Sequence, residues 1–405
     1  MCRGPTFAAL NQSAHPDLDM SGAETFIGNA PRLSLVVPAF NEASRLVRCM
    51  EKLNRAARSG AVDPNCTEVI VVDDGSTDAT ARLAKEVLEP SFPLLHILRL
   101  HENSGKGAAI RAGTALAMAP LIAFMDVDMS VDPVQLPQLL ASVNAAGIAI
   151  GSRSLSSSIV ECNSQRRIVM GRTFNWLVCA LTNVRLADTQ CGFKAFRTPV
   201  ARILFHLMVM DGFAFDVEVL YLARHLGIHI AEVPVNWRDE TGSKVRPLID
   251  PVSMALDVLR MRVARKWPEI PALHIAPGSA HFHLTKPERM DRLLEAVSVR
   301  VPIIQRGHNR ISVLFPLCDP AELRAVARRV DQLAPGMRVS EQPMSFDELR
   351  TLAPLRFLSG RNADVNDADS SAYPSSVDEP SFPPPHIPPR VLLRSLGLVG
   401  PEQCS

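Results

Sequence analysis

The sequence lacks the features that mark secreted, membrane-spanning and nucleic-acid-binding proteins. Its eight cysteines are scattered and form no Cys-x-x-Cys, so we expect reduced thiols rather than a disulfide framework or a zinc site. No uncharged apolar stretch reaches the roughly 18 residues of a membrane-spanning helix, so no transmembrane helix is expected. The net charge of +1 gives no global reason to bind nucleic acid.

Common nucleotide-binding fingerprints are also missing. Gly105-Lys106-Gly107 does not have the Gly-x-x-x-x-Gly-Lys-[Ser/Thr] spacing of a P-loop. No Gly-x-Gly-x-x-Gly follows the first expected strand, which argues against a Rossmann dinucleotide site. Glycines at a helix N-terminus still let backbone N–H groups approach an anion. The sequence therefore leaves open whether this segment lies beside a diphosphate.

What the sequence does contain is an alternation of apolar runs and helical patterns. A hydrophobic fraction of 47% with 21% charged residues is typical of a soluble globular protein. Short apolar runs of the kind found in buried parallel strands alternate with segments of helical spacing. This alternation predicts an α/β domain with a mainly parallel central sheet. The first five expected strands are 33–38, 67–72, 94–100, 120–125 and 146–153.

Polar residues follow three of these strands where each one ends. They are Asn41-Glu42, Asp73-Asp74 and Asp126-Val127-Asp128, and in parallel sheets ligands bind outside the carboxyl ends of strands. A buried carboxylate is costly to desolvate without a cationic partner, and Mg²⁺ or Mn²⁺ would suit the pair Asp126 and Asp128. The alternative for this triplet alone is a pair of solvated residues in a turn.

Two later segments combine basic and bulky apolar residues. Residues 160–184 carry Arg166, Arg167 and Arg172, which suits an anionic lipid head with its tail, although an ordinary amphipathic helix is the alternative. A helix expected over 247–266 has basic residues at its C-terminal end and fits an interfacial helix. Residues 1–31 form no signal peptide, so we expect a flexible leader and a cytoplasmic protein associated peripherally with the cytoplasmic face of a membrane.

The ordered motifs resemble the family 2 glycosyltransferases of GT-A fold, and in particular the dolichyl-phosphate and polyprenyl-phosphate sugar synthases of the glucosyl branch. The resemblance covers roughly residues 32–266. It rests on Val37-Pro38-Ala39-Phe40-Asn41-Glu42, Val71-Val72-Asp73-Asp74-Gly75-Ser76, Asn103-Ser104-Gly105-Lys106-Gly107, Asp126-Val127-Asp128, Gly151-Ser152-Arg153, Asp188-Thr189-Gln190-Cys191-Gly192-Phe193-Lys194 and Phe215-Asp216-Val217-Glu218.

The resemblance implies a site. It implies that the nucleotide contacts Pro38, Ala39, Asn41, Glu42, Asp73, Asp74 and Lys106, with Asp74 holding the base. It implies that Asp126 and Asp128 coordinate Mg²⁺ or Mn²⁺ together with the donor diphosphate. Arg153, Asp188 and Lys194 would join the two metal carboxylates as catalytic residues, and Arg153, Arg172 and Lys194 would grip the acceptor phosphate. Arg197 would also lie on the acceptor side, and Asp216 or Glu218 would contact the transferred sugar. Ser130 is a departure, because many mannosyl-branch relatives have Gln at that position.

The implied reaction is a metal-dependent transfer of a sugar, with glucose from UDP-glucose expected, to a polyprenyl or dolichyl monophosphate. The cation, with Lys106 or an arginine, would offset charge on the leaving nucleoside diphosphate. The acceptor phosphate is already ionised at neutral pH, so direct displacement with inversion needs no general base. The alternatives are GDP-mannose or another donor, a non-lipid acceptor, or a non-catalytic sugar-nucleotide-binding protein.

Beyond residue 268 the resemblance ends. With the transferase domain assigned to 32–267, the βαββαβ order expected over 278–345 predicts a small ferredoxin-like module without an assigned role. His281 and His283 alternate on one expected strand, where a structural or solvent-facing role is favoured over metal binding. Residues 362–389, rich in Asp, Ser and Pro, predict a disordered tail over 359–405.

Overall fold

The structure is a computed structural model that describes residues 30–161, 165–239, 249–263, 267–277, 303–306, 310–317, 323–325, 327–328 and 337–352. The expected leader, the expected disordered tail and the pair His281 and His283 lie outside the described residues. Predictions about these parts of the chain therefore stay predictions.

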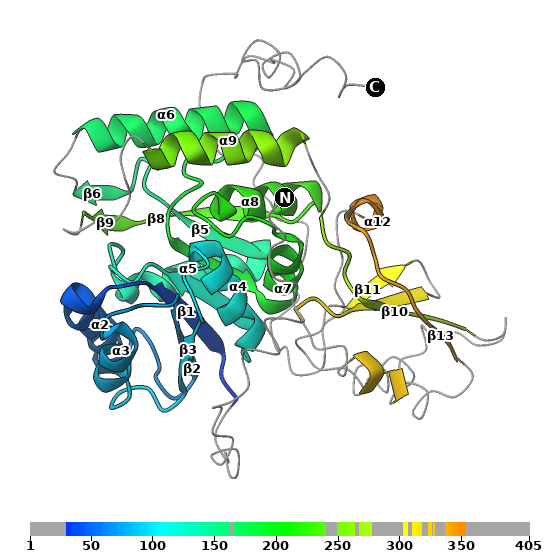
Figure 1. Cartoon of the computed structure of the whole chain (residues 1–405), viewed down its shortest axis with the longest axis horizontal. Coiled ribbons are helices and arrows are strands. Elements are labelled where there is room, and N and C mark those ends of the chain that lie inside the picture. Colours follow the sequence, from blue (N-terminus) through cyan, green and yellow to red (C-terminus); the bar gives the residue numbers. More distant parts are fainter. Residues whose placement is uncertain are drawn as a thin grey trace.

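A seven-stranded sheet forms the centre of the molecule, in the order β3-β2-β1-β4-β7-β5-β8 (Figure 1). Its strands β1 to β4 are parallel, whereas β7 runs antiparallel to both β4 and β5. The prediction of an α/β fold with a mainly parallel sheet is confirmed. The strands are β1 (Leu33–Ala39), β2 (Thr67–Asp73), β3 (Leu95–Arg99), β4 (Leu121–Met125), β5 (Ile148–Ser152), β7 (Phe193–Arg197) and β8 (Ile230–Pro234).

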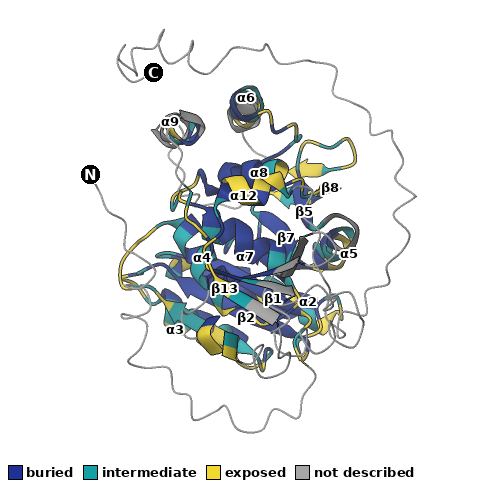
Figure 2. Cartoon of the chain, turned by 90° about the vertical axis from the view of Figure 1, so that its right-hand side faces the viewer, coloured by how far each residue is buried: buried dark blue, intermediate teal, exposed yellow. Residues whose placement is uncertain are grey.

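Helices cover both faces of this sheet because strand side chains alternate between its faces. On β1, Val36 packs in one hydrophobic cluster with helices α4, α7 and α8, whereas Leu35 and Val37 pack in the other with α2, α3 and α5. The strands at the centre of Figure 2 are accordingly buried. The bounds are α2 (Ala43–Arg58), α3 (Thr80–Leu88), α4 (Lys106–Leu116), α5 (Leu136–Ala146), α7 (Thr198–Leu207) and α8 (Phe215–His225).

Two further helices lie side by side beyond one edge of the central domain, as Figures 1 and 2 both show. They are α6 (Gln165–Thr182) and α9 (Ile249–Val263), and near them β6 (Ile159–Glu161) pairs in parallel with β9 (Asn236–Arg238). Phe174, Val178 and Leu181 bury one side of α6. Among the described helices, none has the length and apolar character needed to cross a bilayer.

The C-terminal part contains a four-stranded antiparallel sheet in the order β11-β12-β10-β13. This is the strand order of a βαββαβ module, but most of the two expected helices fall outside the described residues, so the module stays a prediction. The first described strand of this sheet, residues 272–277, lies before residue 278, where the expected module begins, so this strand was not predicted. The elements are β10 (Ala272–Pro277), β11 (Ile303–Arg306), β12 (Arg310–Leu314), β13 (Met337–Glu341) and the helix α12 (Phe346–Thr351).

Candidate active site

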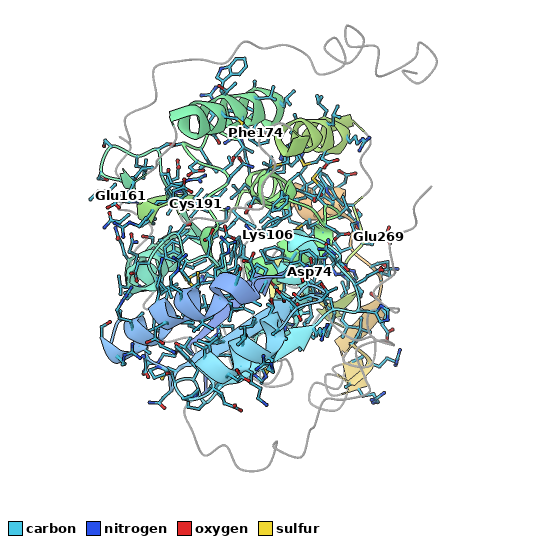
Figure 3. The ribbon with its side chains drawn as sticks, turned by 60° about the vertical axis from the view of Figure 1, so that its left-hand side comes forward. Asp74, Lys106, Glu161, Phe174, Cys191 and Glu269 are labelled. Carbon is cyan, nitrogen blue, oxygen red and sulfur yellow. The ribbon has the colours of Figure 1, made fainter. Side chains whose placement is uncertain are left out.

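The parallel register brings the polar strand ends together at one edge of the sheet. Ala39 at the end of β1 pairs with Asp73 at the end of β2, and β1 also pairs with β4, which ends at Met125. The residues that follow these strands therefore gather at this edge, which we call the carboxyl edge. In Figure 3, Asp74 and Lys106 lie there near one another. The arrangement expected from the sequence is present.

Asp126 and Asp128 stand directly after β4, and a lysine contacts the first of them. The Lys106 Nζ lies 2.6 Å from Asp126 Oδ1, and the two side chains are 18% and 38% exposed. Burial alone would lower the pKa of Lys106, but the charges of Asp126 and Asp216 outweigh burial and raise it above its usual value. Burial, together with the negative charge of Asp126, raises the pKa of the Asp128 carboxyl. The charge of Asp126 thus disfavours a second negative charge on Asp128.

The turn that carries these carboxylates is fixed by its own backbone. The N–H of Asp126 donates to the Gly192 carbonyl at 3.1 Å, and the N–H of Ser130 donates to Asp128 Oδ1 at 3.0 Å. Met129 adopts the left-handed region with φ 50°, and Lys52 Nζ donates to its carbonyl at 2.9 Å. A Cβ on Gly192 would lie 2.1 Å from Asp126 Oδ2. A side chain at position 192 would therefore force the Asp126 carboxylate out of this position.

The donor set at this turn fits a hard divalent cation. Mg²⁺ and Mn²⁺ take oxygen ligands and are commonly bound through one or two carboxylates, with substrate phosphates and water completing the shell. Asp126 and Asp128 provide such a pair. The negative charge of Asp126 raises the pKa of Asp128, and a bound cation would offset this repulsion. Within the described residues, no group of three or more His, Cys, Asp or Glu side chains is arranged to hold a metal.

The residues expected around the nucleotide tie the ends of β1 and β2 together. Asn41, with φ 50°, accepts the Thr77 N–H on its Oδ1 at 2.8 Å and donates its own N–H to Ser76 Oγ at 2.8 Å. Asp73 is buried and accepts the Ser76 N–H at 2.9 Å. Pro38 and Ala39 are buried at the end of β1, and Glu42 pairs with Arg45.

Asp74 holds the loop before α4. Its two carboxylate oxygens accept the N–H groups of Ser104 at 2.8 Å and Gly105 at 2.9 Å, and burial raises its pKa. The expected contact of Asp74 with the base stays a prediction. The amides of Gly107 and Ala108 donate to the Asp211 carbonyl at 2.7 and 3.3 Å. They are thus engaged within the protein, which argues against these two amides as diphosphate ligands.

Arg153 and Asp188 form a two-pronged ion pair. Arg153 Nε and Nη2 donate to the two carboxylate oxygens at 2.6 and 2.9 Å, and the Arg153 backbone N–H adds a bond of 3.1 Å. Burial would raise the pKa of Asp188, but Arg153 outweighs burial and lowers it. Asp188 therefore sets the orientation of a guanidinium that is itself one-third exposed, at 33%, and lies over the Trp237 ring.

Lys194 was expected to contact the acceptor phosphate, but the structure shows its ammonium engaged inside the protein. Its side chain is 1% exposed, and its Nζ donates to Asp216 Oδ1 at 2.6 Å and to the Cys191 carbonyl at 2.8 Å. Asp216 is 5% exposed in this pair, so its expected contact with the sugar is not supported either. The pair joins the segment after Asp188 to helix α8, and burial raises the pKa of the neighbouring Cys191 thiol to about 12.

The geometry gives two further expected contacts no support. Glu218 is fully buried, and its carboxylate accepts backbone N–H groups from Val209 and Met210, so it has no exposed oxygen for a sugar. Arg197 pairs with Leu121 at the start of β4. At about 3.3 Å per residue this is roughly 13 Å along the strand from the carboxyl edge. Arg172 lies in α6, and its side chain is not among those described.

Sequence reasoning missed two charged residues that support the site. Arg45 lowers the pKa of Asp128 electrostatically, in opposition to burial. Glu232 on β8 accepts the backbone N–H groups of Ala187 and Asp188 at 3.0 and 3.2 Å. Glu232 interrupts an apolar strand, and this interruption was the available signal, because a buried carboxylate needs partners.

The structure is an α/β fold with a mainly parallel sheet whose carboxyl edge gathers acidic and basic side chains. The family described as "Glycosyl transferase family 2" matches residues 34–196, and the relatives below are similar along most of their length. The chain belongs to glycosyl transferase family 2, and the resemblance read from the motifs is confirmed.

Three relatives carry the same description, dolichyl-phosphate beta-glucosyltransferase. The protein from Dictyostelium discoideum is 36% identical over 243 residues, covering 57% of this chain and 73% of that protein. The Drosophila melanogaster protein is 37% identical over 242 residues, with 57% and 74% covered. The human protein is 36% identical over 243 residues, with 57% and 75% covered.

Among solved structures, the chain is similar to glucosyl-3-phosphoglycerate synthase from Mycobacterium tuberculosis, crystallised with Mn²⁺, uridine diphosphate and glucosyl-3-phosphoglycerate. The two are 20% identical with a TM-score of 0.42, covering 65% of this chain and 85% of that chain. Likeness at this level carries no conclusion about the ligands of this chain.

Proposed function

We propose that this chain transfers glucose from a nucleotide sugar, UDP-glucose in the first instance, to dolichyl or polyprenyl monophosphate with inversion. The observation that carries the proposal is the Asp126 and Asp128 pair at the carboxyl edge with Lys106 beside it. Relatives described as dolichyl-phosphate beta-glucosyltransferases support the choice of sugar and acceptor.

The donor side is built to stabilise a leaving nucleoside diphosphate. Asp126 and Asp128 would hold Mg²⁺ or Mn²⁺, and the cation would neutralise part of the charge that develops on the diphosphate. Lys106 keeps its proton because its pKa is raised, so its ammonium remains a cation that can move from Asp126 to a phosphate oxygen. Fixed positive charge of this kind stabilises the transition state more than the ground state.

The acceptor side needs a cation and no base. A phosphate monoester is largely ionised at neutral pH and attacks the sugar once it is positioned. Arg153 is partly exposed, and Asp188 holds its guanidinium fork by two bonds, so the remaining nitrogen can bind a phosphate oxygen. Arginine thus replaces Lys194, which is buried, as the proposed acceptor contact.

We further propose that α6 and α9 face a membrane surface that carries the acceptor. Trp176 on α6 is 53% exposed and Leu256 on α9 is 36% exposed, and tryptophan favours the interface between lipid and water. Co-sedimentation with anionic liposomes at low salt tests this. Binding is expected, and protein that stays in solution would contradict it.

The central experiment incubates the full chain with radiolabelled UDP-glucose, a divalent cation and dolichyl phosphate. We expect an organic-soluble glucosyl lipid, which Asp128→Asn reduces about a hundredfold or more. Asp132→Asn is the matched control, because Asp132 is a nearby carboxylate that pairs with Arg55 on the surface, and it should leave the rate unchanged.

Two outcomes would overturn parts of the proposal. Product that appears only with GDP-mannose would reject the donor, and label that stays in the aqueous phase with every donor would reject the lipid acceptor. Full activity of Asp128→Asn would reject the metal site.

A further inference from the structure

A tryptophan between the two parts of the chain contacts the core of the transferase domain. Trp267 follows helix α9 and precedes β10, and its indole Nε1 donates to Glu218 Oε1 at 3.3 Å. Its ring packs on Phe346 of α12 with centroids 4.0 Å apart, and on Tyr221 of α8 at 6.1 Å. Glu218, buried in α8, is thus hydrogen-bonded to a tryptophan that packs against α12 in the C-terminal part of the chain.

The other oxygen of Glu218 holds the loop between α7 and α8. Its Oε2 accepts the N–H groups of Val209 at 3.1 Å and Met210 at 2.8 Å. Arg111 braces the same loop from α4, with Nη1 2.7 Å from Asp211 Oδ1. One buried carboxylate therefore connects Trp267 to residues 209–211.

The backbone of this loop packs directly against the backbone at the start of α4. The Asp211 carbonyl accepts the Gly107 N–H at 2.7 Å. A Cβ on Gly105 would lie 2.4 Å from that carbonyl oxygen, and a Cβ on Gly107 would lie 2.6 Å from the Met210 carbonyl oxygen. Because the two backbones touch in this way, a displacement of the loop must displace Lys106, the first residue of α4.

We propose that Trp267 and Glu218 are positioning residues for the donor site. Their hydrogen bond fixes the loop 209–211, the loop fixes the first turn of α4, and that turn holds the Lys106 ammonium 2.6 Å from Asp126. The C-terminal part of the chain thereby sets donor affinity from outside the carboxyl edge. The proposal rests on the proposed function where it assumes that Lys106 faces the donor diphosphate.

The test replaces Trp267 with phenylalanine, which keeps a ring against Phe346 and removes the N–H donor. We expect the KM for the nucleotide sugar to rise about fivefold to tenfold, as for the loss of one buried hydrogen bond. The KM for the lipid phosphate should not change. Without any substrate, the amides of Gly107, Val209 and Met210 should exchange hydrogen faster than in the natural protein.

Leu349→Ala is the matched control, because Leu349 is fully buried in α12 and its truncation leaves a cavity there while the Trp267 donor to Glu218 is kept. It should lower Tm and reduce the amount of active enzyme while both KM values stay the same. Glu218→Gln is the second variant, since it keeps the shape but places an amide where two sides require an acceptor. Like Trp267→Phe, it should raise the KM for the nucleotide sugar and speed hydrogen exchange at Gly107, Val209 and Met210.

The outcomes separate this inference from the proposed function. If the natural protein transfers no sugar, the proposed function fails, and the exchange measurement still decides the coupling. Unchanged exchange at Gly107 in Trp267→Phe, or the same increase in Leu349→Ala, would overturn the inference. A rise in the acceptor KM equal to that for the donor would overturn it as well.

Discussion

The site contains two lysine–aspartate pairs with the same contact distance and different surroundings. Lys106 and Asp126 are 2.6 Å apart and are 18% and 38% exposed, whereas Lys194 and Asp216 are 2.6 Å apart and are 1% and 5% exposed. The first pair is open to solvent on the Asp126 side, so in the proposed function it can exchange its partner for a ligand. The second has no such access, so it is part of the scaffold.

The two pairs should contribute differently to the free energy of unfolding, because one is buried and the other lies near solvent. A buried ion pair gains little over apolar residues of the same size, but removing one partner leaves a charge without compensation. A pair near solvent contributes about 1 kcal/mol or less. Equal distances therefore do not imply equal roles, and replacing each lysine separately should show this.

The largest effect is expected from Lys194→Met. It leaves Asp216 charged and buried, and we expect a loss of about 3–5 kcal/mol in the free energy of unfolding, measured with denaturant. The double variant Lys194→Met with Asp216→Leu should recover much of this loss, because no charge remains buried. If the single variant is as stable as the natural protein, the scaffold role of this pair is wrong.

Lys106→Met should do the reverse. The free energy of unfolding should change by about 1 kcal/mol or less, whereas the transfer rate should fall about a hundredfold, as for the removal of one transition-state donor. Unfolding with denaturant measures the stability change, and steady-state kinetics measure the transfer rate. A stability loss as large as that of Lys194→Met would remove the distinction between the pairs.

Arg153→Lys probes the acceptor half with a smaller effect. Lysine keeps the charge but cannot form the two-pronged bond to Asp188. The KM for the lipid phosphate should rise about tenfold and the KM for the donor should stay constant. If the KM for the donor rises while the KM for the lipid phosphate does not, Arg153 belongs to the donor half and the acceptor assignment is wrong.

The smallest effect concerns pH and His206. The Leu317 N–H donates to His206 Nδ1 at 3.1 Å, so the proton is on Nε2, 3.0 Å from the Glu269 carbonyl. Burial, followed by the charge of Arg111, lowers the pKa of His206. Its contribution to stability is therefore full above its usual pKa of about 6.5 and is lost as pH falls below that. As pH falls below about 6.5, the Tm of the natural protein should drop more than the Tm of His206→Gln, whereas above this pH the difference between the two Tm values should stay constant.

The sequence was informative where a residue's role follows from its position after a strand. Asp126 and Asp128 could be assigned to the carboxyl edge because parallel strands end together, and the structure places them there. Lys106 was expected beside the nucleotide, and it contacts Asp126. These assignments needed the order of strands and helices but no detailed packing.

The remaining assignments depended on contacts between distant segments. Lys194 and Glu218 belong to the motifs that carried the resemblance, but their contacts in the folded chain decide their roles. Lys194 is buried against Asp216 of α8, and Glu218 is buried against the loop 209–211. Arg197 was misplaced because the antiparallel direction of β7 was not predicted, and this direction carries its end away from Asp126. Trp267 lies just beyond the helix expected over 247–266, and its bond to Glu218 had no signal in the sequence.

The most direct test of the account is a structure of the chain with UDP-glucose and Mn²⁺. We expect the cation between Asp126 and Asp128, Lys106 Nζ moved from Asp126 to the diphosphate, and the Lys194 and Asp216 pair unchanged. A nucleotide bound away from the carboxyl edge, or a diphosphate bound there with Lys106 still on Asp126 and no cation, would contradict it.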